Sequence, residues 1–365
     1  MLIDIIAGAR PNFMKIAPIV RAIELRQSKG SALRYRLVHT GQHYDARMSG
    51  DFFLQLGIPQ PHVNLEVGSG TQAQQTAGIM IGYERLLLEN RSSLCLVVGD
   101  VTSTMACSIS AKKLCVPVAH VEAGIRSGDW TMPEEVNRIL TDSITNYFFT
   151  TTEMANENLR RTGVGNDRIF FVGNTMIDTL LTNQPCFTKP EFFDSLRLKP
   201  GEYFVITLHR PANVDKRDVL GRLLSAIGSS AGRVPVIFPV HPRTAKTLND
   251  LGQLPKNIHV VEPQPYLEFN YLVQYAKAVI TDSGGITEET TVLGVPCLTL
   301  RDSTERPETV SLGTNELLGT DPSALGPAFE RIFAGQWKRG SIPPLWDGKT
   351  GERIVEHLER LLVAT

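Results

Sequence analysis

Short apolar runs alternate with helix-like segments along the whole chain. In the first half, the apolar runs predict strands near residues 2–7, 34–40, 94–98, 117–121, 147–150 and 169–172. Helical spacing of apolar residues predicts helices between them, near 11–27, 72–89, 102–114, 134–146 and 153–161. The second half repeats the scheme, with strands near 203–207, 234–239, 259–261, 278–281 and 297–300 and helices near 216–229, 243–250, 265–276 and 284–293. Strands and helices that alternate in this way form parallel sheets with helices on both faces.

Two such sets of strand–helix units predict two domains. The fold class is therefore α/β, with two doubly wound domains that face each other across a cleft. The segment NQPCFTKPE interrupts the alternation, so we expect the first domain to cover residues 1–173 and the second to cover 174–346. A final helix near 347–362 follows a loop rich in Pro and Gly, and we expect the tail, 347–365, to pack on the first domain.

Composition argues against several classes of protein. The chain of 365 residues has 37 Lys and Arg against 38 Asp and Glu, so no global positive field favours nucleic acid or an anionic membrane. No apolar run reaches membrane-spanning length, and a strand begins at once at the N-terminus, so the expected location is the cytoplasm. The five cysteines include no C-x-x-C pair and the eight histidines are not paired either, so neither a disulfide framework nor a metal site is expected.

The turn between the strand at 278–281 and the next helix has the composition of an anion site. Ser283, Gly284 and Gly285 fill this turn with Asp282, and glycines let the backbone approach a ligand closely. The free N–H groups and the positive dipole end of the helix favour a phosphate there. Glu289 lies one turn further on and is placed to accept hydrogen bonds from sugar hydroxyls. The alternative is an ordinary strand–turn–helix with glycines for tight packing.

Charged residues also follow the first-half strands, where ligands of parallel sheets collect. Arg10 and Lys15 stand at the start of a helix, where cations oppose the macrodipole, so a bound anion explains them better than helix stability. Solvated surface charges are the alternative.

Acidic residues lie between the strand and the helix, or at the start of the helix, in three further strand–helix units. Asp100, Glu122 and Glu134 belong to different units and are expected to point toward one cleft, as general acid–base chemistry would require. Individually, Asp100 is a good helix N-cap and Glu134 is an ordinary first-turn residue. Glu134 and Glu135 are about 100° apart on the helix, so only one can face inward well, and we prefer Glu134.

In the second half, His and Arg residues stand at strand ends. His209 and Arg210 follow one strand and His241 follows the next, as phosphate contacts or a proton donor; packing is the commoner fate of such histidines. The last strong strand is followed by Arg301, Glu305 and Arg306, which can close the anion cradle. Phe269 lies among apolar helix positions, where a core role is the first expectation.

One dinucleotide-binding pattern is present. Gly68, Gly70 and Ala73 satisfy G-x-G-x-x-G/A. The pattern is outside the first strand–helix turn and the run before it, NLEV, is a poor buried strand. A nicotinamide-dependent dehydrogenase is therefore disfavoured.

The motifs taken together resemble the non-hydrolysing UDP-N-acetylglucosamine 2-epimerases. The matching segments run in order along nearly the whole chain: GARPNFMKIAP, TGQHYD, VVGDVTST, HVEAGIRSGDW, MPEEVNRILTD, VGNTMIDTL, TLHRPANVD, PVHPRT, TDSGGITEE, LGVPCLTLR and TERPE. The resemblance implies two Rossmann-like domains of the glycosyltransferase B (GT-B) type. It also implies interconversion of UDP-GlcNAc and UDP-ManNAc without a redox cofactor, through elimination of UDP to 2-acetamidoglucal and re-addition.

The same resemblance implies roles for individual residues. Asp100, Glu122, Glu134 and His209 fall on catalytic positions. Phosphate contacts fall on Arg10, Lys15, Ser283, Gly284, Gly285 and Arg306, with Glu289 at the ribose and Phe269 against uracil. Further substrate contacts are implied at Gln42, His43, Arg210 and His241. Members are usually homodimers, and the expected pathway is surface polysaccharide synthesis.

The chain departs from the family at HRPAN, residues 209–213, where many members read HRREN. The departure bears on the regulatory site at which UDP-GlcNAc activates many bacterial members. Members that act on related UDP-sugars share the motifs, so the exact sugar stays open. A UDP-sugar glycosyltransferase of the same architecture and a nucleotide-sugar sensor without turnover are also compatible with the anion cradle.

Overall fold

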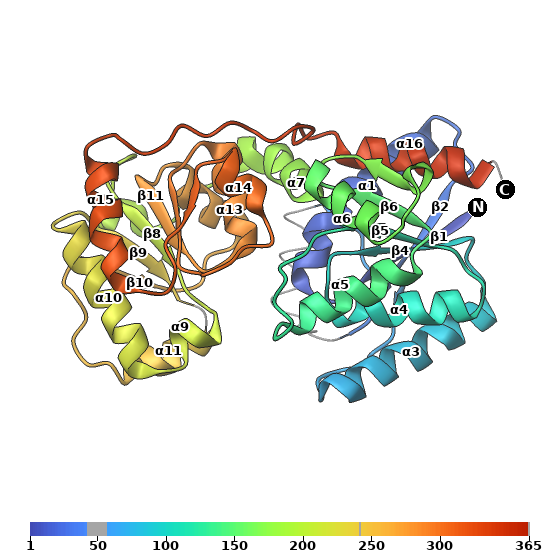
Figure 1. The fold of residues 1–365 in the computed structure, drawn as a ribbon, viewed down its shortest axis with the longest axis horizontal. Coiled ribbons are helices and arrows are strands. Elements are labelled where there is room, and N and C mark those ends of the chain that lie inside the picture. Colours follow the sequence, from blue (N-terminus) through green and yellow to red (C-terminus); the bar gives the residue numbers. More distant parts are fainter. Residues whose placement is uncertain (42–56, 241, 364–365) are drawn as a thin grey trace. The chain divides into compact units, whose positions relative to one another are not determined.

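The computed structural model describes residues 1–41, 57–240 and 242–363. The chain forms two compact units: unit 1 comprises Met1–Thr182 and Pro344–Thr365, and unit 2 comprises Asn183–Pro343. Each unit is an α/β structure built on a single sheet (Figure 1).

Unit 1 contains a parallel sheet of seven strands in the order β3-β2-β1-β4-β5-β6-β7. Its elements are β1 (Leu2–Ala7), α1 (Arg10–Ser28), β2 (Arg34–His39), β3 (Val63–Asn64), α3 (Gln72–Glu89), β4 (Leu94–Val98), α4 (Thr102–Lys113), β5 (Val118–Val121), α5 (Pro133–Ile144), β6 (Tyr147–Thr150), α6 (Glu153–Arg161), η1 (Asn166–Arg168), β7 (Ile169–Phe171), α7 (Thr175–Asn183) and α16 (Thr350–Val363).

The central strands of unit 1 are buried on both faces. One face packs on α3 and α4, where Val97 and Val118 meet Tyr83 and Cys107. On the other side of the sheet α16 packs along α1, and Figure 1 shows the red α16 beside the N-terminal strands. This double covering explains why the strands read as continuous apolar runs and not as alternating ones.

Unit 2 repeats the plan with six parallel strands in the order β10-β9-β8-β11-β12-β13. Its elements are η2 (Gln184–Cys186), α8 (Phe192–Ser195), β8 (Phe204–Thr207), α9 (Pro211–Val214), α10 (Arg217–Ala231), β9 (Val236–Pro239), α11 (Pro242–Asn249), β10 (Ile258–Val261), α12 (Tyr266–Gln274), β11 (Ala278–Thr281), α13 (Gly284–Leu293), β12 (Cys297–Thr299), α14 (Pro307–Ser311), β13 (Asn315–Leu317), η3 (Pro322–Ala324) and α15 (Leu325–Phe333).

Alternation along β8 divides the core of unit 2 between two layers. Phe204 and Ile206 face the layer of α10 and α15, where the ring of Phe329 packs at a tilt against Phe204. Val205 faces the opposite layer with residues of α8 and α12. Figure 1 shows α10 and α15 on one side of this sheet and α13 on the other. The prediction of two doubly wound parallel sheets is therefore confirmed.

Several short elements were not predicted. Strands β3 and β13 have two and three residues, too few to show an apolar run. The helix α15 contains Gly326 and Pro327 in its first turn, which disguise its periodicity. Of the NLEV run before the dinucleotide-like pattern, only Asn64 lies in a strand, the two-residue edge strand β3.

The division between the units differs from the expected boundaries at 173/174 and 346/347. Helix α7 belongs to unit 1, because the Thr179 hydroxyl donates to the Met14 carbonyl oxygen at 2.6 Å. Residues 344–346 also lie in unit 1, where the Trp346 indole donates to the Thr151 carbonyl oxygen at 3.1 Å. The interruption of the strand–helix alternation thus predicted the loop after α7, whereas tertiary contacts determine where unit 1 ends and unit 2 begins.

Candidate active site

In both units the strand order reverses beside the first strand. The reversal lies between β1 and β4 in unit 1 and between β8 and β11 in unit 2. Ligands of open parallel sheets bind at the carboxyl ends of the strands, at this reversal. Most of the described candidates lie in the loops and first helical turns that follow these four strands and their neighbours.

The turn after β1 is tied to the end of β4 by Asn12. Its side-chain oxygen accepts from the amides of Gly8 and Ala9 at 3.2 and 3.0 Å, and its side-chain nitrogen donates to the Val98 carbonyl oxygen at 3.0 Å. The N-terminal turn of α1 is therefore fixed against the loop that carries Gly99 and Asp100.

Glu122 and Lys15 meet in this corner of unit 1. Lys15 Nζ lies 2.8 Å from Glu122 Oε2, and Glu122 is only 4% exposed. Glu122 has a φ of 70°, in the left-handed region that few residues other than Gly adopt. Such backbone strain is concentrated at functional sites. Lys15, predicted as an anion contact, is thus placed beside the candidate catalytic carboxylate.

Asp100 is held by α5. Arg138 Nη2 lies 2.5 Å from Asp100 Oδ2, and the Asn137 side-chain amide donates to the Asp100 carbonyl oxygen at 2.8 Å. The Asp100 carboxylate remains partly exposed, with 27% of its side-chain surface accessible. It is therefore oriented by protein contacts and still reachable by a ligand.

Glu135, not Glu134, is the buried acid of this helix start. It accepts from the backbone amides of Ser127 and Gly128 and pairs with Arg138 at 2.8 Å. Burial alone would raise its pKa, but these hydrogen bonds hold the pKa of Glu135 below its usual value. Glu135 thus holds the 127–128 loop, whereas Glu134, which we expected to face inward, is only half-buried.

A buried His–Asp pair under this site was not predicted. His120 Nδ1 lies 2.7 Å from Asp142 Oδ1, and His120 Nε2 lies 2.8 Å from the Gly99 carbonyl oxygen. Asp142 also pairs with Arg126 at 2.6 Å. The pair connects β5 and α5 to the loop before Asp100, so it sets where the acidic strand ends lie. An acid–base pair 22 residues apart leaves no local pattern in the sequence.

In unit 2, Asp282 organises the two loops at the strand reversal. Its carboxylate accepts from the backbone amides of His209 and Arg210 at 3.1 and 2.9 Å and from Asn213 Nδ2 at 3.1 Å. His209 Nδ1 lies 2.9 Å from Asp282 Oδ1 while half of the His209 side chain is exposed. Asp282 thus orients the ring while about half of the side chain stays accessible.

The charge of Asp282 is stabilised by these contacts. Burial alone would raise the pKa of the Asp282 carboxyl, but the hydrogen bonds from His209, Arg210 and Asn213 hold it below its usual range. The sequence pattern predicted Asp282 only as a turn residue. The sequence signal that could have identified its role is the position of an acid directly after an apolar strand.

The predicted anion cradle is the start of α13. Ser283 is its N-cap residue, and within the described ranges no backbone amide donates to the Ser283 side chain as a cap. Gly284 and Gly285 begin the helix, whose first N–H groups lack intrahelical acceptors. Arg306 lies nearby in the fold of unit 2, held by the buried Glu288 on α13 at 3.0 Å.

Glu289 and Phe269 lie on the two helices α13 and α12. Glu289 is buried, and burial raises its pKa to about 7, against the lowering effect of Tyr266 and Asn270. A desolvated carboxylate of this kind suits hydroxyl donors from a sugar. Phe269 is half-buried and packs against the core of α12, so its ring is partly accessible.

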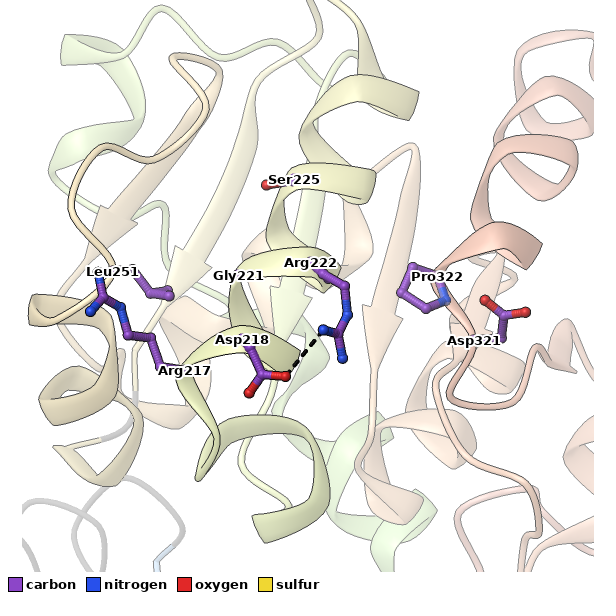
Figure 2. A pocket seen from close by; sticks show the side chains of 8 residues that line it. All are labelled: Arg217, Asp218, Gly221, Arg222, Ser225, Leu251, Asp321 and Pro322. Atoms are coloured by element: carbon purple, nitrogen blue, oxygen red, sulfur yellow. Dashed lines mark hydrogen bonds and ion pairs between the residues drawn. The ribbon is translucent and has the colours of Figure 1, made fainter.

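Some predicted residues lie outside this description. Gln42, His43 and His241 are not among the described residues, nor is the side chain of Arg10. A surface hollow of about 920 Å³ in unit 2, drawn in Figure 2, is formed by α10, η3 and Leu251, and its described lining includes none of the predicted site residues.

Each of the two units has a parallel sheet whose strand order reverses beside its first strand, which is the architecture of an α/β protein of the GT-B class. Acidic residues follow the strands of one unit, and the other contains the helix start of the anion type. The chain belongs to the UDP-N-acetylglucosamine 2-epimerase family, whose model matches residues 24–359.

Relatives cover the chain from end to end. The UDP-N-acetylglucosamine 2-epimerase of Methanocaldococcus jannaschii is 42% identical over 98% of this chain and 99% of its own. Its crystal structure in complex with UDP-GlcNAc and UDP matches with a TM-score of 0.86 at 41% identity, covering 99% of this chain and 100% of that one. The UDP-2,3-diacetamido-2,3-dideoxy-D-glucuronate 2-epimerase of Pseudomonas aeruginosa is 38% identical over 99% of this chain and 100% of its own.

Among the helices described, none is long and apolar enough to span a membrane.

Proposed function

We propose that this chain interconverts UDP-GlcNAc and UDP-ManNAc by removing and returning UDP. The geometric observation that supports this most directly is Glu122, a buried carboxylate in strained backbone, paired with Lys15 and neighbouring the loop of Asp100. Epimerisation at C2 needs proton carriers on two faces of one carbon, and several acids at adjacent strand ends meet that need.

The elimination step balances as follows. A base takes the proton from C2, the C–H electrons form the C1=C2 double bond, and the C1–O bond breaks with its electron pair on UDP. The product pair is 2-acetamidoglucal and UDP. Proton delivery to the opposite face of C2, with return of UDP to C1, gives the epimer. We assign the proton transfers jointly to Asp100, Glu122, Glu134 and His209.

Cleavage of the C1–O bond must contribute to the same transition state as proton removal from C2, because C2–H is not adjacent to a carbonyl group. We assign the diphosphate to the start of α13 and to Arg306, where backbone N–H groups and a guanidinium stabilise growing negative charge. Glu289 takes the ribose hydroxyls and Phe269 packs on uracil. These roles follow the family motifs and agree with the burial and charge of the residues in unit 2.

Incubation with UDP-GlcNAc in heavy water tests the reaction. Deuterium should enter at C2 of both the recovered substrate and the product. Transfer of the sugar to an acceptor without exchange at C2 would instead indicate a glycosyltransferase.

The carboxylates are tested by Asp100→Asn and Glu122→Gln. Each should lower kcat by roughly a hundredfold or more, since loss of a general acid or base has that effect. Binding of UDP should fall much less than kcat, because neither Asp100 nor Glu122 is among the proposed nucleotide contacts. Normal turnover by both variants would contradict the assignment. Binding of UDP with no turnover by the wild-type protein would indicate a sensor.

The 38% identity to the Pseudomonas aeruginosa enzyme supports a second candidate substrate, UDP-2,3-diacetamido-2,3-dideoxy-D-glucuronate. The ratio of kcat/KM for UDP-GlcNAc and UDP-2,3-diacetamido-glucuronate decides between the two sugars. The homodimer, the cytoplasmic location and the polysaccharide pathway stay predictions. Size-exclusion chromatography with light scattering tests the first of these.

A further inference from the structure

A buried ion pair lies against the first turn of α13. Arg301 Nη2 lies 2.6 Å from Glu305 Oε2, and the two side chains are only 5% and 12% exposed. A Cβ placed on Gly284 would be 2.5 Å from Glu305 Oε1 and 3.6 Å from Arg301 Nη1. The pair therefore occupies the space that a side chain at residue 284 would need, and its guanidinium reaches the start of the helix.

The Arg301 guanidinium has hydrogen-bonding capacity left over. One terminal nitrogen is used by Glu305, whereas Nη1 is buried and meets no hydrogen-bond partner within the described ranges. A buried donor without an acceptor destabilises the structure that contains it. An acceptor supplied by a ligand removes that destabilisation, and the nearest ligand site is the helix start.

The helix start has unfilled donors of its own. Helix α13 has ten residues, and its first N–H groups have no acceptor within the helix. Donors of two kinds, from the backbone and from a buried side chain, thus lie near Gly284, where an oxygen of the Glu305 carboxylate is also close. Together they suit a group with several anionic oxygens.

We propose that Arg301 is a diphosphate contact, with Nη1 donating to a phosphate oxygen of the ligand at the start of α13. Glu305 is its positioning residue, holding the guanidinium through Nη2. The planar fork of Arg serves both partners at once, which a Lys ammonium on one flexible stem does not. Within the proposed function, Arg301 adds a cation where charge grows as UDP leaves.

The competing explanation is that Arg301 only neutralises Glu305. The Glu305 carboxyl is strongly held as an anion: burial acts to raise its pKa, but Arg301 lowers it to about 2. Removing Arg301 alone would leave that charge buried and unpaired, which is itself strongly destabilising. A useful variant must therefore remove both charges.

The test compares UDP and uridine binding to the wild-type protein and to Arg301→Gln/Glu305→Gln. The double variant leaves no unpaired buried charge. We expect UDP to bind at least tenfold more weakly and uridine to bind unchanged, because uridine has no phosphate. Equal UDP affinity, or equal losses for both ligands, would overturn the proposal. Arg301→Lys, which keeps a charge for Glu305, should show the same selective loss and serves if the double variant does not fold.

The matched control is Asp218→Asn/Arg222→Gln. This pair lies in the same unit with the same four-residue spacing, at 3.1 Å, but its side chains are 68% and 64% exposed (Figure 2). It should leave both affinities unchanged. If the wild-type protein does not bind UDP, the proposed function is wrong, but the role of Arg301 is still open to test. Inorganic pyrophosphate then replaces UDP in the comparison, and equal binding to wild type and double variant would reject Arg301.

Discussion

Glu289, the residue that we propose as the ribose contact, differs from an ordinary surface acid in its burial. Its carboxyl is buried, with no ion pair to a cation among the described residues, and burial raises its pKa to about 7. Below that pH the group is protonated, and only the ionised form accepts hydrogen bonds from two ribose hydroxyls. Nucleotide affinity should therefore fall as the pH is lowered through 7.

We predict that wild-type protein binds UDP-GlcNAc roughly tenfold more weakly at pH 6 than at pH 8, which is the effect of protonating a group of pKa about 7. Titration calorimetry with UDP-GlcNAc measures this, since its diester phosphates do not titrate in the range. Glu289→Gln should bind weakly with a flat pH profile. An unchanged slope in that variant would assign the dependence to another group.

At the residue scale, the sequence identified the charged groups better than their partners. Asp100, Glu122 and His209 stand at strand ends, which the apolar pattern locates. Their supports depend on pairs far apart in the chain, such as His209 with Asp282, whose backbone-to-carboxylate contact spans 73 residues. Such pairs are set by strand order and have no local signature.

At the scale of elements, strand pairing in unit 1 includes a buried ionic cluster. Asp4 of β1 lies directly opposite Arg36 of β2 in the sheet register. Arg36 donates to both Asp4 oxygens at 2.7 and 2.9 Å, and the Tyr83 hydroxyl of α3 donates to Asp4 at 3.0 Å. The cluster therefore joins two strands to the helix that covers them.

We predict that Asp4→Asn lowers the unfolding free energy of unit 1 by about 3 kcal/mol, because it leaves the buried Arg36 charge unpaired. Glu157→Gln, which breaks an exposed pair with Arg161 in the same unit, should change it by less than about 0.5 kcal/mol. Urea titration of Trp fluorescence in a Trp337→Phe background measures this, since the remaining tryptophans belong to unit 1. Similar losses in both variants would contradict the prediction.

Long elements were predictable because burial on both faces gives long apolar runs. Helices α3 and α13 begin and end where their periodicity predicts, and β4 coincides with its apolar run. Helix α15 was missed because Gly326 and Pro327 in its first turn mimic a loop. Its residue Phe329 is nonetheless a buried core residue.

At the scale of the whole molecule, unit 1 is discontinuous in sequence. The chain leaves it after residue 182 and returns at 344. The returning helix α16 is fixed by Asp178 of α7, whose carboxylate accepts from the Gly351 amide at 2.7 Å. The Gly351 position also touches α1, where an added Cβ would be 2.6 Å from the Pro18 carbonyl oxygen.

We predict that Gly351→Ala destabilises unit 1 by about 1–3 kcal/mol, since the backbone oxygen of Pro18 cannot move aside without repacking α1. The matched change Gly326→Ala, also in the first turn of a helix, places a Cβ that meets no described atom within 4 Å and should be neutral or stabilising. Thermal unfolding of both variants decides; equal midpoints would show that α16 is loosely attached.

The discontinuity has a consequence during protein synthesis. Helix α16 follows all of unit 2 in the sequence, so the ribosome completes residues 183–343 before the segment that covers α1 exists. The nascent unit 1 then presents the apolar side of α1 to solvent or to chaperones until α16 emerges. Folding of unit 1, which carries Asp100 and Glu122, is thereby linked to translation of unit 2, which carries the anion cradle. A chain that stalls before residue 344 leaves unit 1 without α16.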